Sequence, residues 1–227
     1  MRDTKKRIGL RRHIRQGRVL LDRLPDQLLG LDTAEQISNA ALGYGLDRGL
    51  WYEASPWRTL SKVLPRGDVT DADVFADFGC GKGRVLLQAA RYPFRKVIGV
   101  ELSTEVSAIA RSNIDRVRRH LRCQDVEVVT ADLLEYPIPD DLSIAFCYNP
   151  VTGELFRRLL RNLGESLIRH PRPLRLLYFN PWMHDIATQE GWREDRRLSI
   201  RMIKCPVDLA IYRKAGPDAI AQPVRVV

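Results

Sequence analysis

Two hydrophobic periodicities alternate along most of the chain. Short runs rich in Val, Ile, Leu and Phe are typical of buried strands, and they predict strands at residues 73–78, 96–101, 126–130, 143–149 and 174–180. Between them, apolar residues spaced three and four positions apart predict helices at residues 83–92, 103–121 and 152–169. Strands that alternate with helices predict parallel β units joined by right-handed crossovers.

The two ends of the chain depart from this alternation. Residues 1 to about 65 are predicted to be mainly helical, with turns at residues 43–45 and at Ser55-Pro56, and with Ser55 capping a helix that continues to Leu64. An irregular piece follows Asn180, and two β-like runs at residues 198–204 and 207–213 are close enough to pair as a hairpin. We therefore predict an α/β fold: a Rossmann-like, doubly wound and mostly parallel sheet of seven strands, with a C-terminal antiparallel hairpin and an N-terminal helical extension.

The composition fits one domain in a reducing compartment. A chain of 227 residues is long enough for one α/β domain with a short extension. No apolar stretch approaches the roughly 18 to 20 residues of a membrane span, and the N-terminus lacks the apolar segment of a secretory signal, so we expect a cytoplasmic protein. Neither a zinc site nor a disulfide framework is predicted from the four widely spaced cysteines, which are Cys80, Cys123, Cys147 and Cys205.

The net charge of +9 is concentrated at one end. Residues 1–23 hold nine Lys or Arg against Asp3 and Asp22, a net charge of +7, which leaves only +2 for the rest of the chain. Apolar residues at partly helical spacing interrupt this basic arm. Packing on the domain or solvation is the favoured interpretation, while contact with nucleic acid, another acidic partner or a membrane surface stays open.

The segment from Asp77 to Arg84, Asp-Phe-Gly-Cys-Gly-Lys-Gly-Arg, joins the first predicted strand of the sheet to its helix. Its three alternate glycines allow positive φ angles and close approach of a ligand to the backbone, which indicates a nucleotide-like cofactor. A dinucleotide fingerprint requires G-x-G-x-x-G, and Arg84 stands where its last glycine belongs. This disfavours an NAD-dependent oxidoreductase.

Two further acidic residues end the next two predicted strands. Glu101 lies eighteen positions after Gly83, where a carboxylate accepts hydrogen bonds from both ribose hydroxyls of an adenosine. Because the same geometry serves NAD, Glu101 indicates an adenosine site without choosing the cofactor. Asp132 follows the strand at residues 126–130, and an exposed turn residue is the alternative interpretation of it.

The Asp-x-Gly-x-Gly-x-Gly spacing resembles motif I of the class I S-adenosylmethionine-dependent methyltransferases. Its Cys-Gly-Lys-Gly-Arg form is similar to that of bacterial members and, more distantly, to the Dot1-type lysine methyltransferases. The resemblance implies S-adenosyl-L-methionine as cofactor and S-adenosyl-L-homocysteine as product, with Asp77 near the methionine amino group and Asp132 at the adenine amino group. The expected cofactor-binding residues are Asp77, Gly79, Cys80, Gly81, Gly83, Glu101, Leu102, Asp132, Leu133, Asn149, Tyr52 and Ser55.

The segment Trp51 to Trp57 resembles a Tyr-x-x-Ser/Thr-Pro element of the same bacterial methyltransferases. There the element closes over the cofactor, which makes Tyr52 and Ser55 candidate contacts with its methionine end. A hydrophobic staple and helix cap is an equal alternative. We accordingly expect residues 1–65 to form a basic N-terminal helical extension with this lid element, and residues 66–227 to form the cofactor-binding methyltransferase domain.

Asn149-Pro150 ends the fourth predicted strand, where ligands of open α/β sheets bind. It resembles half of the Asn/Asp-Pro-Pro-Tyr/Phe element of N-methyltransferases, in which the Asn accepts hydrogen bonds from the target amine. The sequence departs from that element at Val151 and Thr152, so the aromatic platform is missing unless Tyr148 replaces it. Nitrogen as the acceptor atom therefore stands beside oxygen, sulfur and carbon, and a strand-terminating turn is the structural alternative.

His184, in the segment after Asn180-Pro181, is a candidate general base, although a lone loop histidine is more often a bystander. The candidate catalytic residues are thus Asn149, Tyr148 and His184. The resemblance implies a methyltransferase acting on a small molecule or natural product, a protein side chain, or RNA, and the oligomeric state is open. The rival hypothesis is a noncatalytic binding module of the same fold that acts through its basic arm; the intact acidic positions argue against it.

Overall fold

The computed structural model describes residues 24–34, 37–38, 51–52, 54–201 and 206–216. For residues 37–38, 51–52 and 201 it describes the backbone alone. The predicted turn at residues 43–45, the basic arm at residues 1–23 and Cys205 lie outside this description.

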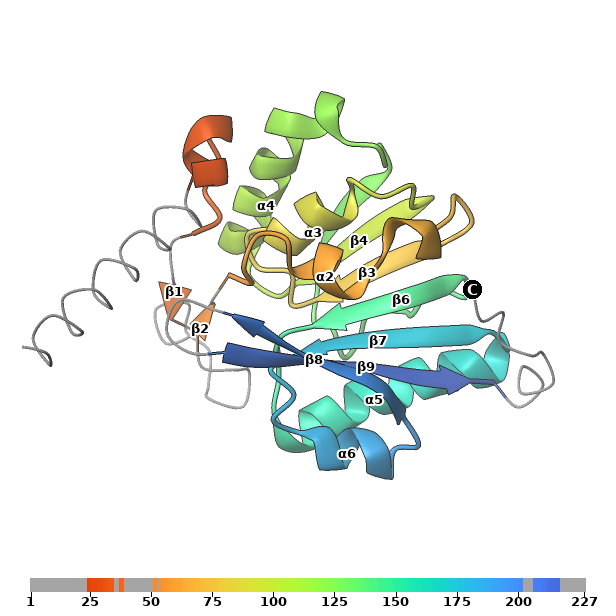
Figure 1. Ribbon diagram of the computed structural model, residues 1–227. Coiled ribbons are helices and arrows are strands. Elements are labelled where there is room, and N and C mark those ends of the chain that lie inside the picture. The colour runs from red at the N-terminus through yellow and green to blue at the C-terminus, as the bar shows by residue number, and fades with distance from the viewer. Residues whose placement is uncertain (1–23, 35–36, 39–50, 53, 202–205, 217–227) are drawn as a thin grey trace, which may run out of the picture.

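A sheet of seven strands, in the order β5-β4-β3-β6-β7-β9-β8, forms the centre of the described structure (Figure 1). The first five strands in this order are parallel, and β9 pairs antiparallel with both β7 and β8. The predicted α/β architecture, a mostly parallel sheet of seven strands with a C-terminal antiparallel hairpin, is thereby confirmed. The strands are β3 (Val74–Phe78), β4 (Lys96–Glu101), β5 (Val126–Thr130), β6 (Leu142–Cys147), β7 (Pro173–Phe179), β8 (Arg193–Arg201) and β9 (Pro206–Ala215).

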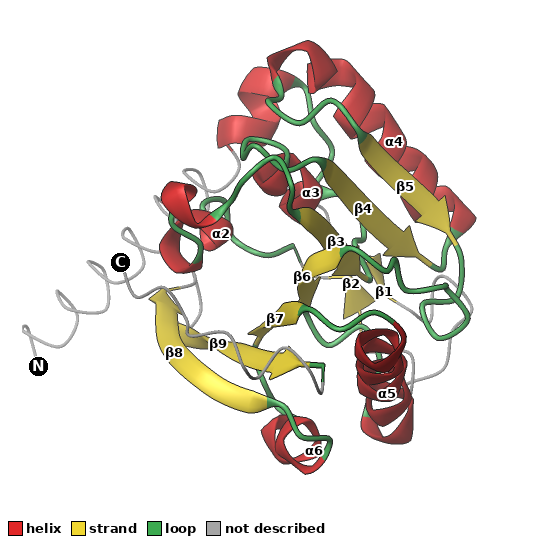
Figure 2. Cartoon of the chain, turned by 90° about the vertical axis from the view of Figure 1, so that its right-hand side faces the viewer, coloured by secondary structure: helices red, strands yellow, loops and turns green. Residues whose placement is uncertain are grey.

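Helices cover both faces of the sheet (Figures 1 and 2). One face packs against α2, α3 and α4, and the other packs against α5 and α6. Alternate strand residues face the two layers: Phe75 packs with the first group, and Val74 and Ala76 pack with the second. The helices are α2 (Thr59–Val63), α3 (Arg84–Ala89), α4 (Thr104–Val117), α5 (Gly153–Arg169) and α6 (His184–Gln189), with the 3-10 turns η2 (Arg66–Asp68) and η3 (Arg118–His120).

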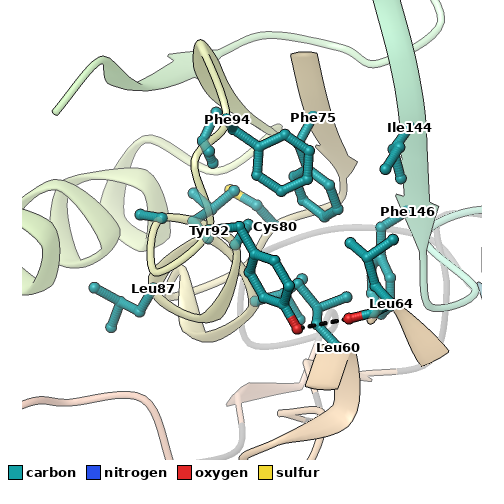
Figure 3. Close-up of a cluster of buried hydrophobic side chains, with 14 of the residues drawn as sticks. Leu60, Leu64, Phe75, Cys80, Leu87, Tyr92, Phe94, Ile144 and Phe146 are labelled. Carbon is teal, nitrogen blue, oxygen red and sulfur yellow. Dashed lines mark hydrogen bonds between the residues drawn. The ribbon is translucent and has the colours of Figure 1, made fainter. Parts of the chain in front are cut away.

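A cluster of aromatic and aliphatic side chains joins α2 to the sheet (Figure 3). The rings of Phe75 and Phe94 lie 5.4 Å apart between centroids, and Tyr92 lies 6.0 Å from Phe94. The Tyr92 hydroxyl donates a hydrogen bond to the carbonyl oxygen of Leu64 at 2.9 Å, so its polar end is satisfied inside the core. The short helix α2 is therefore held by its buried face.

The N-terminal region differs from the predicted helical extension. Residues 24–29 are helical, but β1 (Ile37–Ser38) and β2 (Trp51–Tyr52) form an antiparallel strand pair. The prediction that Ser55 caps the following helix is wrong, because α2 begins at Thr59 after Arg58, whose φ is 71°. Ser55 is instead buried, and its carbonyl oxygen accepts a hydrogen bond from the Arg84 side chain at 3.3 Å.

The C-terminal hairpin also differs in detail. The piece after Asn180 contains α6, and β8 begins at Arg193 rather than at residue 198. The start of β8 was not predicted because its first residues are mostly charged. Charge is tolerated there because β8 lies at the edge of the sheet, and it deters pairing with other chains. The inner strand β9 is apolar where it crosses the core, and its buried segment is Leu209, Ala210, Ile211 and Tyr212.

Candidate functional site

The order of strands reverses at β3, which has β4 on one side and β6 on the other. In open α/β sheets a crevice forms outside the carboxyl ends of the strands at such a point. The loops that leave this edge begin at Gly79 after β3, at Leu102 after β4, at Ala131 after β5 and at Tyr148 after β6. The topology therefore brings the acidic and glycine positions singled out in the sequence to one edge.

The loop after β3 has a backbone that only glycine adopts readily. Gly79, Gly81 and Gly83 have φ angles of 82°, 54° and 83°. A Cβ added to Gly79 would lie 2.5 Å from the Cβ of Pro150, so the loops after β3 and β6 touch at this point. The helix predicted at residues 83–92 is α3, which spans Arg84–Ala89 with Gly83 as its N-cap.

Glu101 fastens the glycine loop to the end of β4. Its Oε2 accepts a hydrogen bond from the backbone N–H of Gly81 at 3.0 Å, and its Oε1 accepts one from Ser103 N–H at 3.0 Å. Burial raises the pKa of Glu101, and the bonds from Ser103 and Gly81 oppose this shift. Because each carboxylate oxygen has a second lone pair, Glu101 retains acceptor capacity for a ligand.

Asp77 is the most unusual group of the site. It is 2% exposed, and no donor among the described residues forms a hydrogen bond with its carboxylate. Burial raises the pKa of Asp77 well above its usual value, and the negative charge of Glu101 raises it further. A buried carboxylate without a donor is costly to folding, and such groups are found where a ligand supplies the missing partner.

Asp132 lies next to Glu101. Its Oδ1 accepts a hydrogen bond from Leu134 N–H at 2.9 Å, and the preceding residue, Ala131, donates its N–H to the carbonyl oxygen of Glu101 at 2.9 Å. Among the apolar candidates, Leu133 is buried and Leu102 is half-buried.

Cys80 is buried between the loop and the sheet. Its Sγ lies 2.7 Å from the point that a Cβ on Gly99 would occupy. Burial raises the pKa of its thiol, so Cys80 is a small apolar packing group at neutral pH. Cys123 and Cys147 are also free and buried.

Asn149 links the ends of β6 and β7. Its Oδ1 accepts a hydrogen bond from the Tyr178 hydroxyl at 2.5 Å, and its Nδ2 donates one to the carbonyl oxygen of Asn180 at 2.9 Å. Both asparagines have left-handed backbones, with φ angles of 46° and 54°. Tyr148 packs edge-on against Phe179, with ring centroids 4.7 Å apart. Contact of either candidate with an acceptor stays a prediction.

The two remaining candidates are His184, at the start of α6, and Tyr52, in β2. The Nδ1 of His184 lies 2.8 Å from the Tyr212 hydroxyl and 3.1 Å from Oε2 of Glu194, so it contacts β8 and β9. Only the backbone of Tyr52 is described.

Sequence reasoning missed two buried cations in the glycine loop. Lys82 and Arg84 are 1% and 2% exposed, and their ion-pair partners are Asp32 at 2.8 Å and Asp26 at 2.7 Å. Charged residues that alternate with glycines between a buried strand and a buried helix require counterions, and this signal was present in the sequence.

Within the described residues, no helix has the length and apolar character to cross a membrane, and no group of three or more His, Cys, Asp or Glu side chains is arranged to hold a metal ion. A cytoplasmic location stays a prediction.

Part of the chain matches a known protein family. Residues 75–168 match a family model described as a methyltransferase domain. A protein-lysine N-methyltransferase from Saccharolobus islandicus (strain REY15A) is 32% identical over 66 residues, which are 29% of this chain and 41% of that protein. The match thus spans about two fifths of the length of that relative.

Two solved structures share the arrangement of the sheet. A SAM-dependent methyltransferase from Aquifex aeolicus has a TM-score of 0.54 at 16% identity, covering 70% of this chain and 93% of that one. Magnesium protoporphyrin IX methyltransferase from Synechocystis PCC 6803 with bound SAM also scores 0.54, at 15% identity over 68% of this chain and 76% of its own. Residues 75–168 therefore match a methyltransferase domain. The seven-stranded sheet and its helices have the fold of the S-adenosylmethionine-dependent methyltransferases.

Proposed function

We propose that this protein is an S-adenosylmethionine-dependent methyltransferase whose cofactor lies against the glycine loop. Asp77 pairs with the methionine amino group, Glu101 accepts the ribose hydroxyls, and Asp132 lies at the adenine. The observation that carries the proposal is the buried carboxylate of Asp77, which has no hydrogen-bond donor among the described residues. A cationic amino group on the ligand removes the cost of burying this charge.

The neighbouring residues fit the same cofactor. The three glycines have no side chain between the loop backbone and a ligand, and Gly79 makes the close contact with Pro150 possible. Glu101 is held in place by two backbone N–H groups, so its orientation does not depend on the ligand. The Cys-Gly-Lys-Gly-Arg loop supports placing the chain with bacterial methyltransferases that share it.

S-adenosylmethionine supplies an electrophilic methyl group on a positively charged sulfur. The work left to the chain is to position the acceptor and to accept any proton that blocks its lone pair. We propose Asn149 for the positioning, because it lies in the loop that follows β6 beside the crevice and bonds to Tyr178 of β7 and to Asn180 just after β7.

Tyr178 sets the orientation of the Asn149 amide. The Tyr178 hydroxyl accepts a hydrogen bond from Met183 N–H at 3.4 Å, so its own proton is given to Oδ1 of Asn149. Nδ2 is fixed at the same time by the carbonyl oxygen of Asn180. Oδ1 keeps one lone pair, which is suited to the N–H of an amine acceptor.

An amine nitrogen is thus the acceptor atom that we propose. The protein-lysine N-methyltransferase relative supports a lysine side chain as the first amine to test, although the match covers less than half of that protein. A small-molecule amine and RNA are the alternatives. His184 is held by Tyr212 and Glu194, so we propose no base role for it.

Calorimetric titration of the full chain with S-adenosylmethionine, S-adenosylhomocysteine and NAD tests the cofactor. We expect binding of both sulfur nucleotides and none of NAD. Glu101→Gln should weaken binding, while Glu127→Gln, the same change at an exposed residue of the edge strand β5, should leave it unchanged. Failure of both sulfur nucleotides to bind would overturn the proposal in favour of a noncatalytic module.

The acceptor is tested by transfer of a tritiated methyl group from labelled S-adenosylmethionine. A lysine-rich peptide, the same peptide with every lysine acetylated, a small diamine and a short RNA are compared in parallel. Label in the unmodified peptide or in the diamine supports an amine acceptor. Label confined to RNA, or equal label in the acetylated and unmodified peptides, contradicts it.

A further inference from the structure

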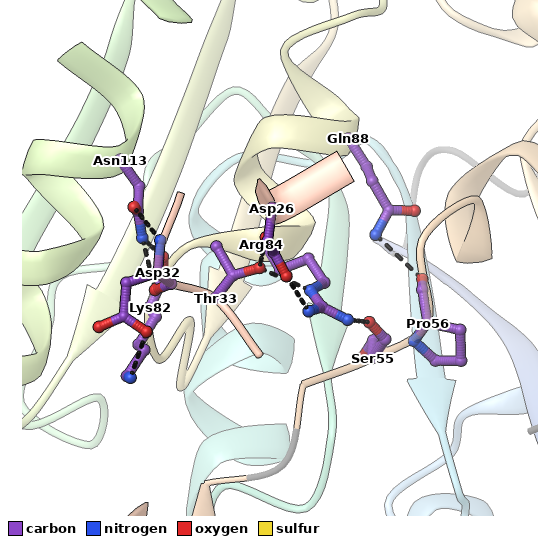
Figure 4. Close-up of polar contacts among 9 residues, drawn as sticks. All are labelled: Asp26, Asp32, Thr33, Ser55, Pro56, Lys82, Arg84, Gln88 and Asn113. Atoms are coloured by element: carbon purple, nitrogen blue, oxygen red, sulfur yellow. Dashed lines mark hydrogen bonds and ion pairs between the residues drawn. The ribbon is translucent and has the colours of Figure 1, made fainter. Parts of the chain in front are cut away.

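One guanidinium joins three segments of the chain (Figure 4). Nη2 of Arg84 donates to Oδ2 of Asp26 at 2.7 Å, and Nε donates to Oγ1 of Thr33 at 2.7 Å. Nη1 donates to the carbonyl oxygen of Ser55 at 3.3 Å. Thr33 in turn donates to Oδ1 of Asp26 at 2.5 Å, which closes the network. A side chain at the start of α3 therefore holds both the segment that precedes β1 and the segment that follows β2.

Lys82 makes a second connection to the upstream segment. Its Nζ donates to Oδ1 of Asp32 at 2.8 Å. Oδ1 of Asn113, on α4, accepts a hydrogen bond from the backbone N–H of Asp32 at 2.9 Å. Nδ2 of Asn113 donates hydrogen bonds to the carbonyl oxygens of Asp32 and Lys82, at 2.9 and 3.0 Å. The glycine loop, α4 and the upstream segment meet at this junction (Figure 4).

The two sets of contacts occupy alternate positions of one short loop. The backbone N–H of Gly81 bonds to Glu101, and Gly79 meets Pro150, so these two glycines contact residues at the candidate cofactor crevice. Lys82 and Arg84 direct their side chains to the upstream segment instead. Because Arg84 and Asp26 are both buried, separating them would leave an unpaired charge away from water. Separation of the upstream segment from the loop is therefore disfavoured.

We propose that Arg84 is a positioning residue for the cofactor site, which docks residues 26–33 and Ser55 against the glycine loop and so couples their ordering to cofactor binding. The inference rests on the proposed function and adds residues that contact no cofactor. By linkage, a cofactor that tightens the loop must also stabilise the docked upstream segment, and loosening that segment must weaken cofactor binding.

The test combines calorimetry with hydrogen exchange of the full chain, using S-adenosylhomocysteine as the probe. Arg84→Lys keeps the charge and loses the forked pairing geometry. Arg95→Lys makes the same change in the exposed ion pair with Asp141 and serves as the matched control. We expect S-adenosylhomocysteine to slow exchange in residues 24–34 of the wild type. Arg84→Lys should weaken its binding about tenfold and abolish that protection, and Arg95→Lys should do neither.

The outcomes separate the two proposals. Absence of S-adenosylhomocysteine binding to the wild type removes the proposed function and this inference together. Binding without added protection at residues 24–34, or unchanged affinity in Arg84→Lys, overturns this inference alone. Should Arg84→Lys fail to fold, Thr33→Val removes the hydrogen bonds of the Thr33 hydroxyl to Arg84 and Asp26 and keeps the ion pair between those two residues. That variant should bind S-adenosylhomocysteine more weakly, and unchanged affinity in it also overturns the inference.

Discussion

Gly79 and Pro150 are in such close contact that a Cβ on Gly79 would lie 2.5 Å from the Cβ of Pro150. The two residues follow β3 and β6, the neighbouring strands at which the sheet reverses its order. The contact therefore sets the distance between the loop proposed to hold the cofactor and the loop that contains Asn149.

Gly79→Ala tests this contact. Its φ of 82° strains an alanine, and the added methyl group collides with Pro150. We expect the free energy of unfolding to fall by about 2–4 kcal/mol and S-adenosylhomocysteine binding to be lost. Gly67→Ala is the control, because a Cβ there meets nothing within 4 Å; it should change stability by less than about 0.5 kcal/mol. Urea denaturation measures both, and equal effects of the two variants would contradict the prediction.

Asp77→Asn separates stability from function. The substitution removes a buried charge that lacks a donor among the described residues and lies near Glu101. We expect the ligand-free variant to be more stable at neutral pH by about 1 kcal/mol, and its affinity for S-adenosylhomocysteine to fall about tenfold or more. Thermal unfolding and calorimetry measure the two quantities. A variant that is less stable and binds normally would remove Asp77 from the site.

The pH dependence follows from the raised pKa of Asp77. The pKa of an Asp in the unfolded chain is about 3.9. Because the pKa of Asp77 is higher than this in the folded protein, the folded protein binds the proton more tightly than the unfolded chain does. The contribution of Asp77 to ligand-free stability is therefore greatest below the unfolded pKa and is lost as pH rises through the folded pKa. Pairing of the ionised carboxylate with a ligand amino group has the opposite trend, so cofactor affinity should rise over the same interval.

Calorimetric titrations between pH 5 and 8, together with unfolding curves at each pH, measure these opposed trends. Both should flatten in Asp77→Asn if Asp77 is their source, and Glu101 contributes in the same direction through its own raised pKa. Affinity that is constant with pH in the wild type would exclude a titrating carboxylate at the ligand.

Asn149 is expected to tolerate glycine better than alanine. Its φ of 46° lies in the left-handed region, which costs an alanine about 1 kcal/mol or more relative to glycine. Both variants lose the hydrogen bonds to Tyr178 and Asn180, so both should be less stable than the wild type, with Asn149→Ala the lower of the two. Ser112 is an exposed position inside α4, and there the order should reverse by about 1 kcal/mol in favour of alanine. Chemical denaturation of the four variants measures the two differences.

Much of the fold follows from local pattern. The strand predicted at residues 96–101 is β4 with the same bounds, and that at 126–130 is β5, because apolar runs between turns leave little choice of element or end. The strand order depends on the pairing of distant segments. An apolar run predicts β9 as a strand, although it does not predict its place between β7 and β8. The charged residues that begin β8 at Arg193 gave no strand pattern.

The candidate site was predictable where its chemistry is local in sequence. The glycines directly follow β3 and Glu101 is the last residue of β4, and the structure brings them into contact through Gly81. The partner of Arg84 was not predictable, since Asp26 lies 58 residues away and no periodicity links the two. The left-handed conformation of Asn149 had a weak signal, because asparagine tolerates it better than most residues.

The alternation of glycines with Lys82 and Arg84 has a consequence for relatives of this chain. Two buried cations, four and six positions after the end of the buried strand β3, cannot change independently of Asp32 and Asp26, which neutralise them. Relatives with an apolar residue at the position of Arg84 should therefore also have lost the acid at the position of Asp26, and those that keep one should keep both. The loop motif and a pair of acids far upstream should be inherited as one unit.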